Sequence, residues 1–456
     1  MSNTILPPSG EQKAIRWYPP SYDIRIETVP IPQILHPDDA IVKVQFAALC
    51  GSDLHIYRGH GGVNKDHTCG HEFIGAVVAL GHSYGGDNTG RPSLYSTLKI
   101  GDKVVSPFTV NCGECHACRL GYTGRCPEGF LFGSPALEGG QAQYVRVPKG
   151  GGTLFNLSDP STWSSNLSNK EKEKALTTLS DSSLLMLADI LPTGVFAALQ
   201  VINHPKVAPI ITGKPWPMCF SKDDAPSSNQ ISLTDEDKIL TVAVIGLGPV
   251  GICATVSMLD LLATRQIPYK FVAVDPLESR REKAAAVYNT IDTACKANGE
   301  FAVCSIDEAK DKVKEWTGGV GCTAVLEVVG NTSALTLSYD LIRAFGVIVS
   351  VGVHGEPLLP FTGRQAYNKN VSFDFGRCPA RAMFPPAFDL LGDDISRRAS
   401  RRFSDVFKVK RQDVFGGIGQ PASLIDRVVD FSQAVDIYRA FDKGEVGKVI
   451  FDPWRA

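Results

Sequence analysis

The 456-residue sequence lacks an excess of charge of either sign. Its 46 Lys and Arg residues nearly balance its 48 Asp and Glu residues, so the formal net charge is −2. A protein that binds the phosphate backbone of a nucleic acid needs a basic surface. The sequence therefore predicts no nucleic-acid partner.

The sequence also lacks a long uninterrupted apolar segment. Its most apolar stretch, residues 184–202, contains Asp189, Pro192 and Gly194, which indicates a buried helix rather than a membrane crossing. The first residues of the chain include neither a basic segment nor a long apolar segment, so we expect no secretory signal. We therefore expect a cytoplasmic protein with no membrane partner.

Cysteine, by contrast, is frequent, with 12 residues. In a long chain without a secretory signal, this content indicates metal binding by reduced thiols rather than a disulfide framework. Four cysteines are separated by two, two and seven residues: Cys112, Cys115, Cys118 and Cys126. Four thiolates can close on one tetrahedral Zn²⁺ and leave no position for a substrate, which predicts a structural zinc site. The alternatives are an iron–sulfur cluster, because Pro127 follows the last cysteine, and unligated thiols.

A second group of chemically active residues lies in residues 50–72. Cys50 and His71 are of the types that bind Zn²⁺, and Glu72 follows His71 directly. Ser52 and His55 carry a hydroxyl and an imidazole that could move a proton from a molecule bound to the metal. The stretch predicts a catalytic metal centre, although each residue taken alone could equally be packed or solvated.

A glycine-rich turn lies in the middle of the chain, between an apolar run at residues 239–245 and a helical pattern at 252–262. The turn comprises Gly246, Gly248, Pro249, Val250 and Gly251. Glycines between a buried strand and a helix allow a dinucleotide pyrophosphate to approach the helix N-terminus, so this context predicts a nucleotide site.

An acidic residue, Asp275, ends the next predicted strand. A carboxylate there can accept both hydroxyls of an adenosine ribose and would repel a 2′-phosphate, which favours NAD over NADP. Arg280 lies five residues further on. It is expected to cover the adenine from a helix surface, and the alternative is that it tolerates a phosphate.

The pattern of apolar residues predicts an α/β protein in three parts. Residues 1–190 alternate in short runs broken by prolines, as in a β-rich domain, with a surface loop insertion at 84–98 and the zinc lobe at about 112–126. Residues 191–376 follow the βαβ pattern of a doubly wound parallel sheet, with an insertion at 203–237 before its first strand. Residues 377–456 end in a strand and are expected to return to the first domain.

The order of these motifs resembles the zinc-dependent medium-chain alcohol dehydrogenases over nearly the whole chain, apart from the two insertions. The resemblance implies a GroES-like catalytic domain, a Rossmann domain and a homo-oligomer, either a dimer or a tetramer. It also implies that Cys50 and His71 bind a catalytic zinc, with Glu72 either as an exchangeable ligand or as a residue that contacts the ligands without binding the metal. The residue at the position of the third ligand is Asp189, and an Asp at this position resembles the branch that contains glutathione-independent formaldehyde dehydrogenase. The alternative is that Asp189 caps a helix or is a buried carboxylate without a metal.

The cofactor side of the resemblance contains one departure. Gly51 stands where some members carry a basic residue that contacts the cofactor pyrophosphate. Lys448 is expected to supply part of that charge, and a surface lysine is the alternative.

Two zinc ions and NAD are therefore the expected cofactors. The expected activity is hydride transfer between NAD and an alcohol or hydrated aldehyde, with Ser52 and His55 moving the proton. Two alternatives remain: a zinc-free reductase of the same superfamily that acts on activated double bonds, and a non-catalytic NAD-binding module.

Overall fold

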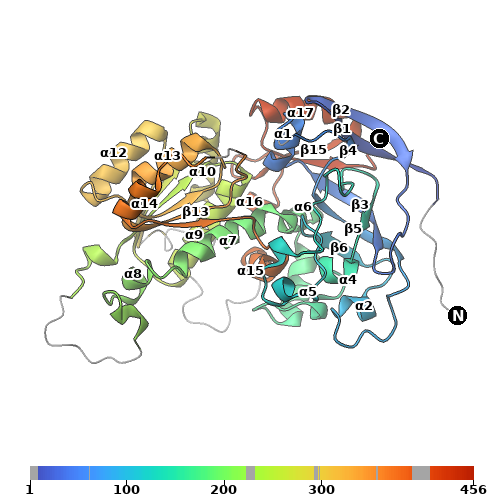
Figure 1. Ribbon diagram of the computed structural model, residues 1–456, viewed down its shortest axis with the longest axis horizontal. Coiled ribbons are helices and arrows are strands. Elements are labelled where there is room, and N and C mark those ends of the chain that lie inside the picture. Colours follow the sequence, from blue (N-terminus) through green and yellow to red (C-terminus); the bar gives the residue numbers. More distant parts are fainter. Residues whose placement is uncertain are drawn as a thin grey trace. The chain divides into compact units, whose positions relative to one another are not determined.

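The computed structural model describes residues 9–60, 62–221, 232–291, 296, 298–355, 358–392 and 411–455 (Figure 1). Residues 222–231 of the predicted 203–237 insertion lie outside this set, as do residues 1–8, on which the expected absence of a signal partly rests. The chain forms two compact units. Unit 1 takes its residues from Met1–Pro192, Pro379–Ser396 and Arg411–Ala456, and unit 2 takes its described residues from Thr193–Cys378.

Unit 1 is built on a seven-stranded sheet and a three-stranded sheet. The strands of the larger sheet are β3 (Ala40–Ala48), β5 (Glu72–Leu80), β6 (Lys103–Ser106), β7 (Tyr144–Val147), β8 (Phe155–Asn156), β15 (Ile425–Asp430) and β16 (Lys448–Asp452). The smaller sheet has the order β2 (Asp23–Pro30), β1 (Glu11–Tyr18) and β4 (His67–Thr68). Strand β16 pairs antiparallel with β3, so the C-terminal strand completes a sheet of N-terminal strands.

The helices of unit 1 are short. They are α1 (Gly51–Tyr57), α2 (Leu94–Thr97), α3 (His116–Arg119), α4 (Gly150–Thr153), α5 (Asn169–Thr178), α6 (Asp181–Leu185), α15 (Ala380–Gly392), α16 (Arg411–Phe415) and α17 (Ala434–Asp442). Helix α2 differs from the surface loop predicted at 84–98. Leu94 and Tyr95 are buried, because these apolar side chains join the unit 1 core.

Unit 2 contains a six-stranded parallel sheet in the order β11, β10, β9, β12, β13, β14. The bounds are β9 (Leu240–Ile245), β10 (Tyr269–Val274), β11 (Gly299–Cys304), β12 (Cys322–Glu327), β13 (Ile342–Ser350) and β14 (Ser372–Phe375). This order reverses between β9 and β12, as in doubly wound dinucleotide-binding folds. Every residue of β9 is buried, as expected for a parallel strand covered on both faces.

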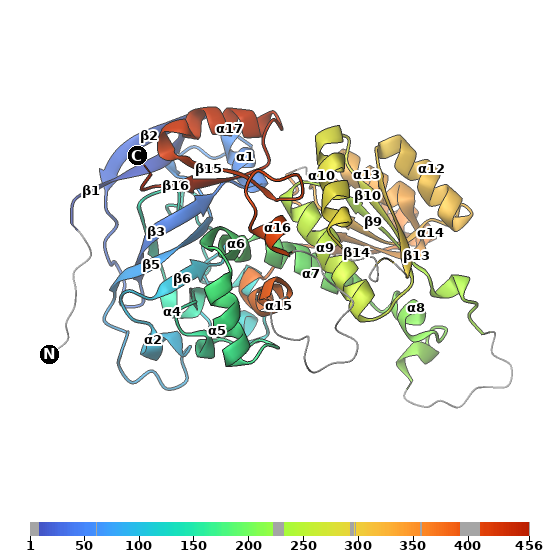
Figure 2. The ribbon, with the colours of Figure 1, turned by 180° about the vertical axis from the view of Figure 1, so that it is seen from behind.

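Helices cover both faces of this sheet. They are α9 (Pro249–Thr264), α10 (Glu278–Asn289), α12 (Ile306–Thr317), α13 (Thr332–Leu341) and α14 (Gly363–Lys369). A separate short helix, α8 (Ala208–Thr212), packs against the 3-10 turns Met218–Phe220 and Glu236–Lys238. Figure 2 shows α9 and α10 over one face, and Figure 1 shows α12 and α13 over the other. Helix α9 begins at Pro249, a residue well suited to the first turn because its missing N–H needs no partner there.

Helix α7 (Ile190–Ile202) carries much of the apolar stretch noted in the sequence. Among the described residues no single helix is long and apolar enough to cross a membrane. By length and composition alone, one pair of helical segments, Asp181–Ala188 and Ile190–Ile202, would reach that limit together, but it is bent by 53°.

Candidate active site and metal centres

Four potential ligands from distant parts of the sequence meet inside unit 1. The ligand atoms of Cys50, His71, Glu72 and Asp189 all lie within 4.8 Å of one another, and all four residues are buried. Asp189 Oδ2 lies 3.5 Å from Cys50 Sγ and 3.3 Å from His71 Nε2. We call this group the mixed cluster. It brings together all four residues that the sequence predicted for the catalytic zinc.

The pairing of two strands explains how Cys50 and His71 meet. Strand β3 ends at Ala48 and β5 begins at Glu72, and these two residues are partners in the antiparallel ladder. Cys50 and His71 therefore leave the sheet at the same edge. Asp189 comes from the start of α7, and the backbone beside it is held by a 3.2 Å hydrogen bond from Phe108 N to Ala188 O.

Asp53 supports both Cys50 and His71. Its Oδ2 accepts a 2.9 Å hydrogen bond from the backbone N–H of Cys50 at the start of α1. Its Oδ1 lies 3.4 Å from Nδ1 of His71. Because Nδ1 is turned toward Asp53, Nε2 is the ring nitrogen that faces the mixed cluster. A carboxylate in this position fixes the orientation of a metal-binding imidazole.

The charges of the mixed cluster fit a bound cation. Burial raises the pKa of the Cys50 thiol, and the carboxylates of Asp189 and Glu72 raise it further. Burial opposes protonation of His71, but Asp53 and Asp189 outweigh it and raise the pKa of the ring. These shifts keep protons on the thiol and on the ring, and a cation bound among the four residues would displace those protons. Thiolate, imidazole and carboxylate at this separation are ligands typical of Zn²⁺.

Glu72 is held by one carboxylate oxygen only. Its Oε1 accepts a hydrogen bond from Nζ of Lys448, while its Oε2 has no hydrogen-bond partner among the described protein atoms. The free oxygen adds a further potential ligand to the mixed cluster.

Lys448 has a different partner from the one predicted. We expected its ammonium to contribute to a cofactor pyrophosphate site, but Lys448 is fully buried in β16 and paired with the buried Glu72. A buried carboxylate needs a counter-charge, and strand β16 places Lys448 beside it. The sequence carried no sign of this pairing, because the two residues are 376 positions apart.

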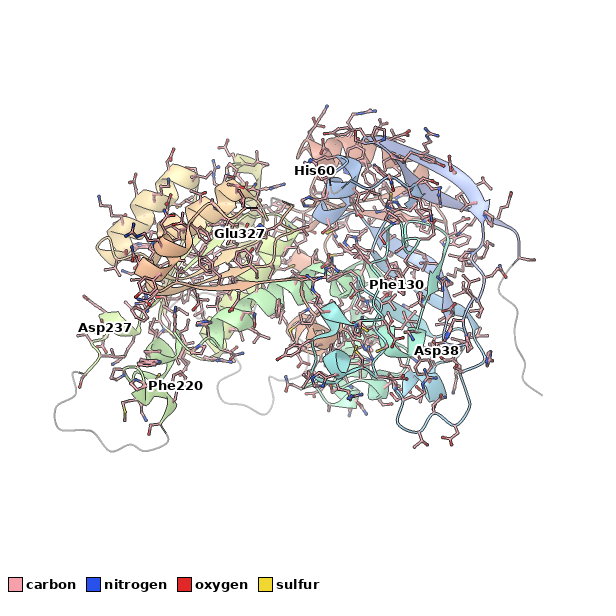
Figure 3. The ribbon with its side chains drawn as sticks, in the orientation of Figure 1. Asp38, His60, Phe130, Phe220, Asp237 and Glu327 are labelled. Carbon is pink, nitrogen blue, oxygen red and sulfur yellow. The ribbon has the colours of Figure 1, made fainter. Side chains whose placement is uncertain are left out.

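Ser52 and His55 lie one helical turn apart on α1. Ser52 Oγ is 3.8 Å from Cys50 Sγ, so its hydroxyl lies beside the mixed cluster. Burial lowers the pKa of His55, and the charges of His60 and Arg58 lower it further. The ring of His60, a residue labelled in Figure 3, lies with its centroid 6.0 Å from that of His55. A neutral imidazole near neutral pH is able to accept a proton.

The four spaced cysteines form a second cluster, which we call the thiolate lobe. Cys112 Sγ lies 4.0 Å from Cys118 Sγ and 3.6 Å from Cys126 Sγ, and Cys115 Sγ lies 3.9 Å from Cys126 Sγ. Sulfur atoms bound to one tetrahedral zinc at about 2.3 Å are separated by about 3.8 Å. The backbone N–H of Cys118 lowers the pKa of Cys115 to about 7, whereas burial raises the pKa of Cys112 and of Cys118, so the fit to zinc rests on the sulfur positions. The lobe therefore fits a four-thiolate zinc.

Apart from Lys448, the predicted nucleotide residues lie in unit 2, at the carboxyl ends of β9 and β10 and in the helices that follow these strands. Gly246 has a φ of +94°, and a Cβ on Gly251 would lie 1.8 Å from Gly246 O, so both positions require glycine. Gly248 has open space where a Cβ would stand, which leaves room for a ligand. Pro249 and Val250 form the first turn of α9.

The side chain of Asp275 is hydrogen-bonded to this glycine-rich turn. Its Oδ2 accepts a 2.8 Å hydrogen bond from Leu247 N and its Oδ1 a 2.9 Å hydrogen bond from Leu277 N. Arg280 Nη1 lies 3.5 Å from the same carboxylate. The carboxylate is thus fixed between the glycine-rich turn and α10.

A network at the same edge of the sheet was not predicted. Glu327, labelled in Figure 3, ends β12 and accepts a 2.6 Å hydrogen bond from the hydroxyl of Ser350, which ends β13. His354 Nε2 lies 2.6 Å from that hydroxyl. Ligands of doubly wound sheets bind at the carboxyl ends of the strands. The available signal was a polar residue at the end of each apolar run.

Two sequence profiles match the chain. Residues 36–159 match the alcohol dehydrogenase GroES-like domain, and residues 249–393 match the zinc-binding dehydrogenase profile. A zinc-type alcohol dehydrogenase B of Aspergillus flavus is 35% identical over 443 residues, which cover 97% of this chain and 81% of that protein. The chain belongs to the zinc-type alcohol dehydrogenase family. A formaldehyde dismutase of Pseudomonas putida is 27% identical over 94% of this chain and 95% of its own length.

A solved structure of an alcohol dehydrogenase from Thermus sp. ATN1 superposes with a TM-score of 0.65 at 25% identity, covering 96% of this chain and 99% of that one. These matches confirm the predicted family, the α/β fold class with its GroES-like and Rossmann domains, and the prediction of an oxidoreductase. Zinc as a cofactor is confirmed at the level of the family.

Proposed function

We propose that this zinc-type alcohol dehydrogenase catalyses the reversible oxidation of a small alcohol or hydrated aldehyde, with NAD as the hydride acceptor. The observation that carries the proposal is the convergence of Cys50, His71 and Asp189 beside the hydroxyl of Ser52. When bound, zinc supplies Lewis-acid polarisation of the substrate oxygen, and NAD supplies the position that receives the hydride.

Residues of this chain would bind the metal, orient its imidazole ligand and move the substrate proton. Cys50, His71 and Asp189 would hold the metal, and Asp53 keeps the ring of His71 in the orientation that presents Nε2. Ser52 Oγ would accept the hydroxyl proton of the substrate, and His55 would receive it and pass it to solvent. The lowered pKa of His55 favours the neutral ring that this transfer needs.

The preference for NAD follows from Asp275. Its carboxylate is fixed beside the glycine-rich turn, where it would accept hydrogen bonds from an adenosine ribose and repel a 2′-phosphate. Arg280 Nη1 lies 3.5 Å from the Asp275 carboxylate. Asp275 therefore partly balances the positive charge of Arg280, which would otherwise favour a 2′-phosphate.

Metal and nucleotide analysis of the purified protein tests the proposal, followed by a panel of alcohols and aldehydes with NAD and with NADP. We expect two zinc ions per chain and turnover of small alcohols or aldehydes that is faster with NAD. The variant Cys50→Ser, which nearly keeps the size of the side chain, should retain the zinc of the thiolate lobe but lose the catalytic zinc and turnover. A protein with no zinc, or one that reduces activated double bonds instead, would favour the zinc-free reductase. Nucleotide binding without turnover on the whole panel would favour a non-catalytic module.

We further propose that the enzyme acts as a cytoplasmic homo-oligomer on small molecules, with no nucleic-acid or membrane partner. The support is the near-zero net charge and the family resemblance. Light scattering on the purified protein measures the oligomeric state, and a monomer at micromolar concentration would contradict this part of the proposal.

A further inference from the structure

Two buried ring nitrogens of unit 1 belong to residues that share a small cavity with Asp53, the residue that contacts Cys50 and His71 of the mixed cluster. Trp17 Nε1 and His67 Nε2 have no hydrogen-bond partner among the described protein atoms, although Trp17 is 0% and His67 1% exposed. The two residues face each other across β1 and β4, with ring centroids 5.6 Å apart. A buried polar atom without a partner costs about 1–3 kcal/mol, so two of them side by side indicate a bound polar group.

The two nitrogens have complementary roles. The indole N–H of Trp17 can only donate a hydrogen bond. In His67, Nδ1 lies 3.1 Å from the carbonyl oxygen of Lys65, so this nitrogen carries the proton. Burial lowers the pKa of His67, which keeps the ring neutral and leaves Nε2 as an acceptor. A group that bridges the two nitrogens must therefore accept a hydrogen bond from Trp17 and donate one to His67.

A small cavity lies at this place. Its volume is about 10 Å³, and the polar groups in its lining include Trp17, His67 and Asp53. A cavity of roughly this size holds one water molecule when two or more polar partners line it. Asp53 offers the third partner, because each of its carboxylate oxygens has a second lone pair beyond its contact with Cys50 or His71.

We propose that one internal water binds here, accepting a hydrogen bond from Trp17 Nε1 and donating to His67 Nε2 and to the carboxylate of Asp53. His67 is then a positioning residue that acts through the water and Asp53 on the catalytic metal centre. Asp53 holds Cys50 by its backbone N–H and His71 by its ring. The proposed water donates a hydrogen bond to the Asp53 carboxylate on the side away from Cys50 and His71. This hydrogen bond limits rotation of the carboxylate away from those two residues.

The inference for His67 rests on the proposed function of the mixed cluster, whereas the water site itself does not. A crystal structure of the zinc-loaded protein tests the water site directly. We expect electron density for one water within hydrogen-bond distance of both Trp17 Nε1 and His67 Nε2. A cavity without such density overturns the water site, whatever the metal content of the protein.

Metal release to a chelator tests the positioning role, with the zinc of the thiolate lobe as an internal control. Replacing the catalytic zinc by Co²⁺ gives the mixed cluster its own absorption spectrum, so the two sites can be followed separately. In His67→Phe we expect release from the mixed cluster to be about 10-fold faster, because the loss of a group that supports a metal ligand lowers metal affinity by about 10- to 100-fold. Release from the thiolate lobe should stay unchanged.

Two further variants separate positioning from general destabilisation. His67→Gln retains an acceptor and should restore most of the slow release, while Trp17→Phe removes only the donor and should give a smaller increase than His67→Phe. Equal release from the wild type and all three variants overturns the positioning role, as does equal acceleration at both metal sites. If His67→Phe does not fold, Trp17→Phe and His67→Gln carry the test. A mixed cluster that never binds metal would instead refute the proposed function.

Discussion

The two metal clusters of unit 1 are built in opposite ways. The thiolate lobe takes its four sulfur ligands from residues 112–126, and backbone N–H groups of the same loop contact them. The mixed cluster takes its ligands from residues 50, 71, 72 and 189. Local spacing alone can define the first cluster, whereas the second exists only when β3, β5 and the start of α7 are assembled.

The two clusters also differ in their exposure to solvent and in the charged residues around them. Cys115 and Cys118 of the thiolate lobe are partly exposed, while every residue of the mixed cluster is buried. The mixed cluster also depends on two charged residues outside its ligand set, Asp53 and Lys448. We therefore expect changes in the lobe to affect mainly stability, and changes in the mixed cluster to affect mainly chemistry.

The largest effect is expected for Asp189→Asn. The amide has the size of the carboxylate but lacks its charge, so the mixed cluster should lose metal affinity and turnover should fall by about 1000-fold, comparable to removing a dominant electrostatic contribution. Steady-state kinetics and zinc content measure this, with the melting temperature as a control for folding. Unchanged turnover in a variant that retains both zinc ions would remove Asp189 from the ligand set.

A loss of stability is expected for Lys448→Met. The change leaves Glu72 buried and without its counter-charge, which destabilises by about 3–5 kcal/mol when one member of a buried ion pair is removed. Denaturant unfolding measures this free energy. The double variant Lys448→Met with Glu72→Gln should recover much of the loss, because no unpaired charge remains. A single variant as stable as the wild type would show that the pair is not needed.

A smaller loss of stability is expected for Cys115→Ser. The thiolate lobe would lose one of four sulfur ligands, and with it part of the folding energy that the metal supplies. We expect the melting temperature to fall by about 5 °C or more, with turnover per folded molecule close to that of the wild type at low temperature. An unchanged melting curve would contradict a structural zinc in the lobe.

The smallest effect is expected for His55→Asn. The neutral ring is the form that accepts a proton, and the lowered pKa keeps the ring neutral to a lower pH than the ordinary value of about 6.5. Wild-type turnover should therefore persist at pH 6.5 and fall only in more acidic solution. The variant should lose about 10-fold in turnover and also lose this acidic limb, because general bases of this kind contribute at least that much. An identical pH profile would exclude His55 from the proton path.

These contrasts also explain which features the sequence could predict. The thiolate lobe and the glycine-rich turn are defined by spacing over fewer than twenty residues, and the strand order of unit 2 follows from its βαβ pattern. Asp189 was identified only by resemblance to a family, because no local pattern marks a lone carboxylate as a ligand. The pairing of Lys448 with Glu72 could not be predicted, since it depends on the assembled sheet, in which β3 lies between β16 and β5.

Two other features depend on the assembled fold for the same reason. Glu327, Ser350 and His354 come together only because β12 and β13 are neighbours in the sheet. Leu94 and Tyr95 sit in a segment of polar composition, yet they reach the unit 1 core as part of α2. In both cases the sequence showed the residues but not their neighbours.

The most direct test of the central claim is anomalous diffraction at the zinc absorption edge, on crystals of the protein purified without chelator. Two peaks are predicted, one within the thiolate lobe and one bonded to Cys50 Sγ, His71 Nε2 and a carboxylate oxygen of Asp189. A single peak confined to the lobe, or a second peak ligated without Asp189, would contradict the assignment of the mixed cluster as the catalytic metal centre.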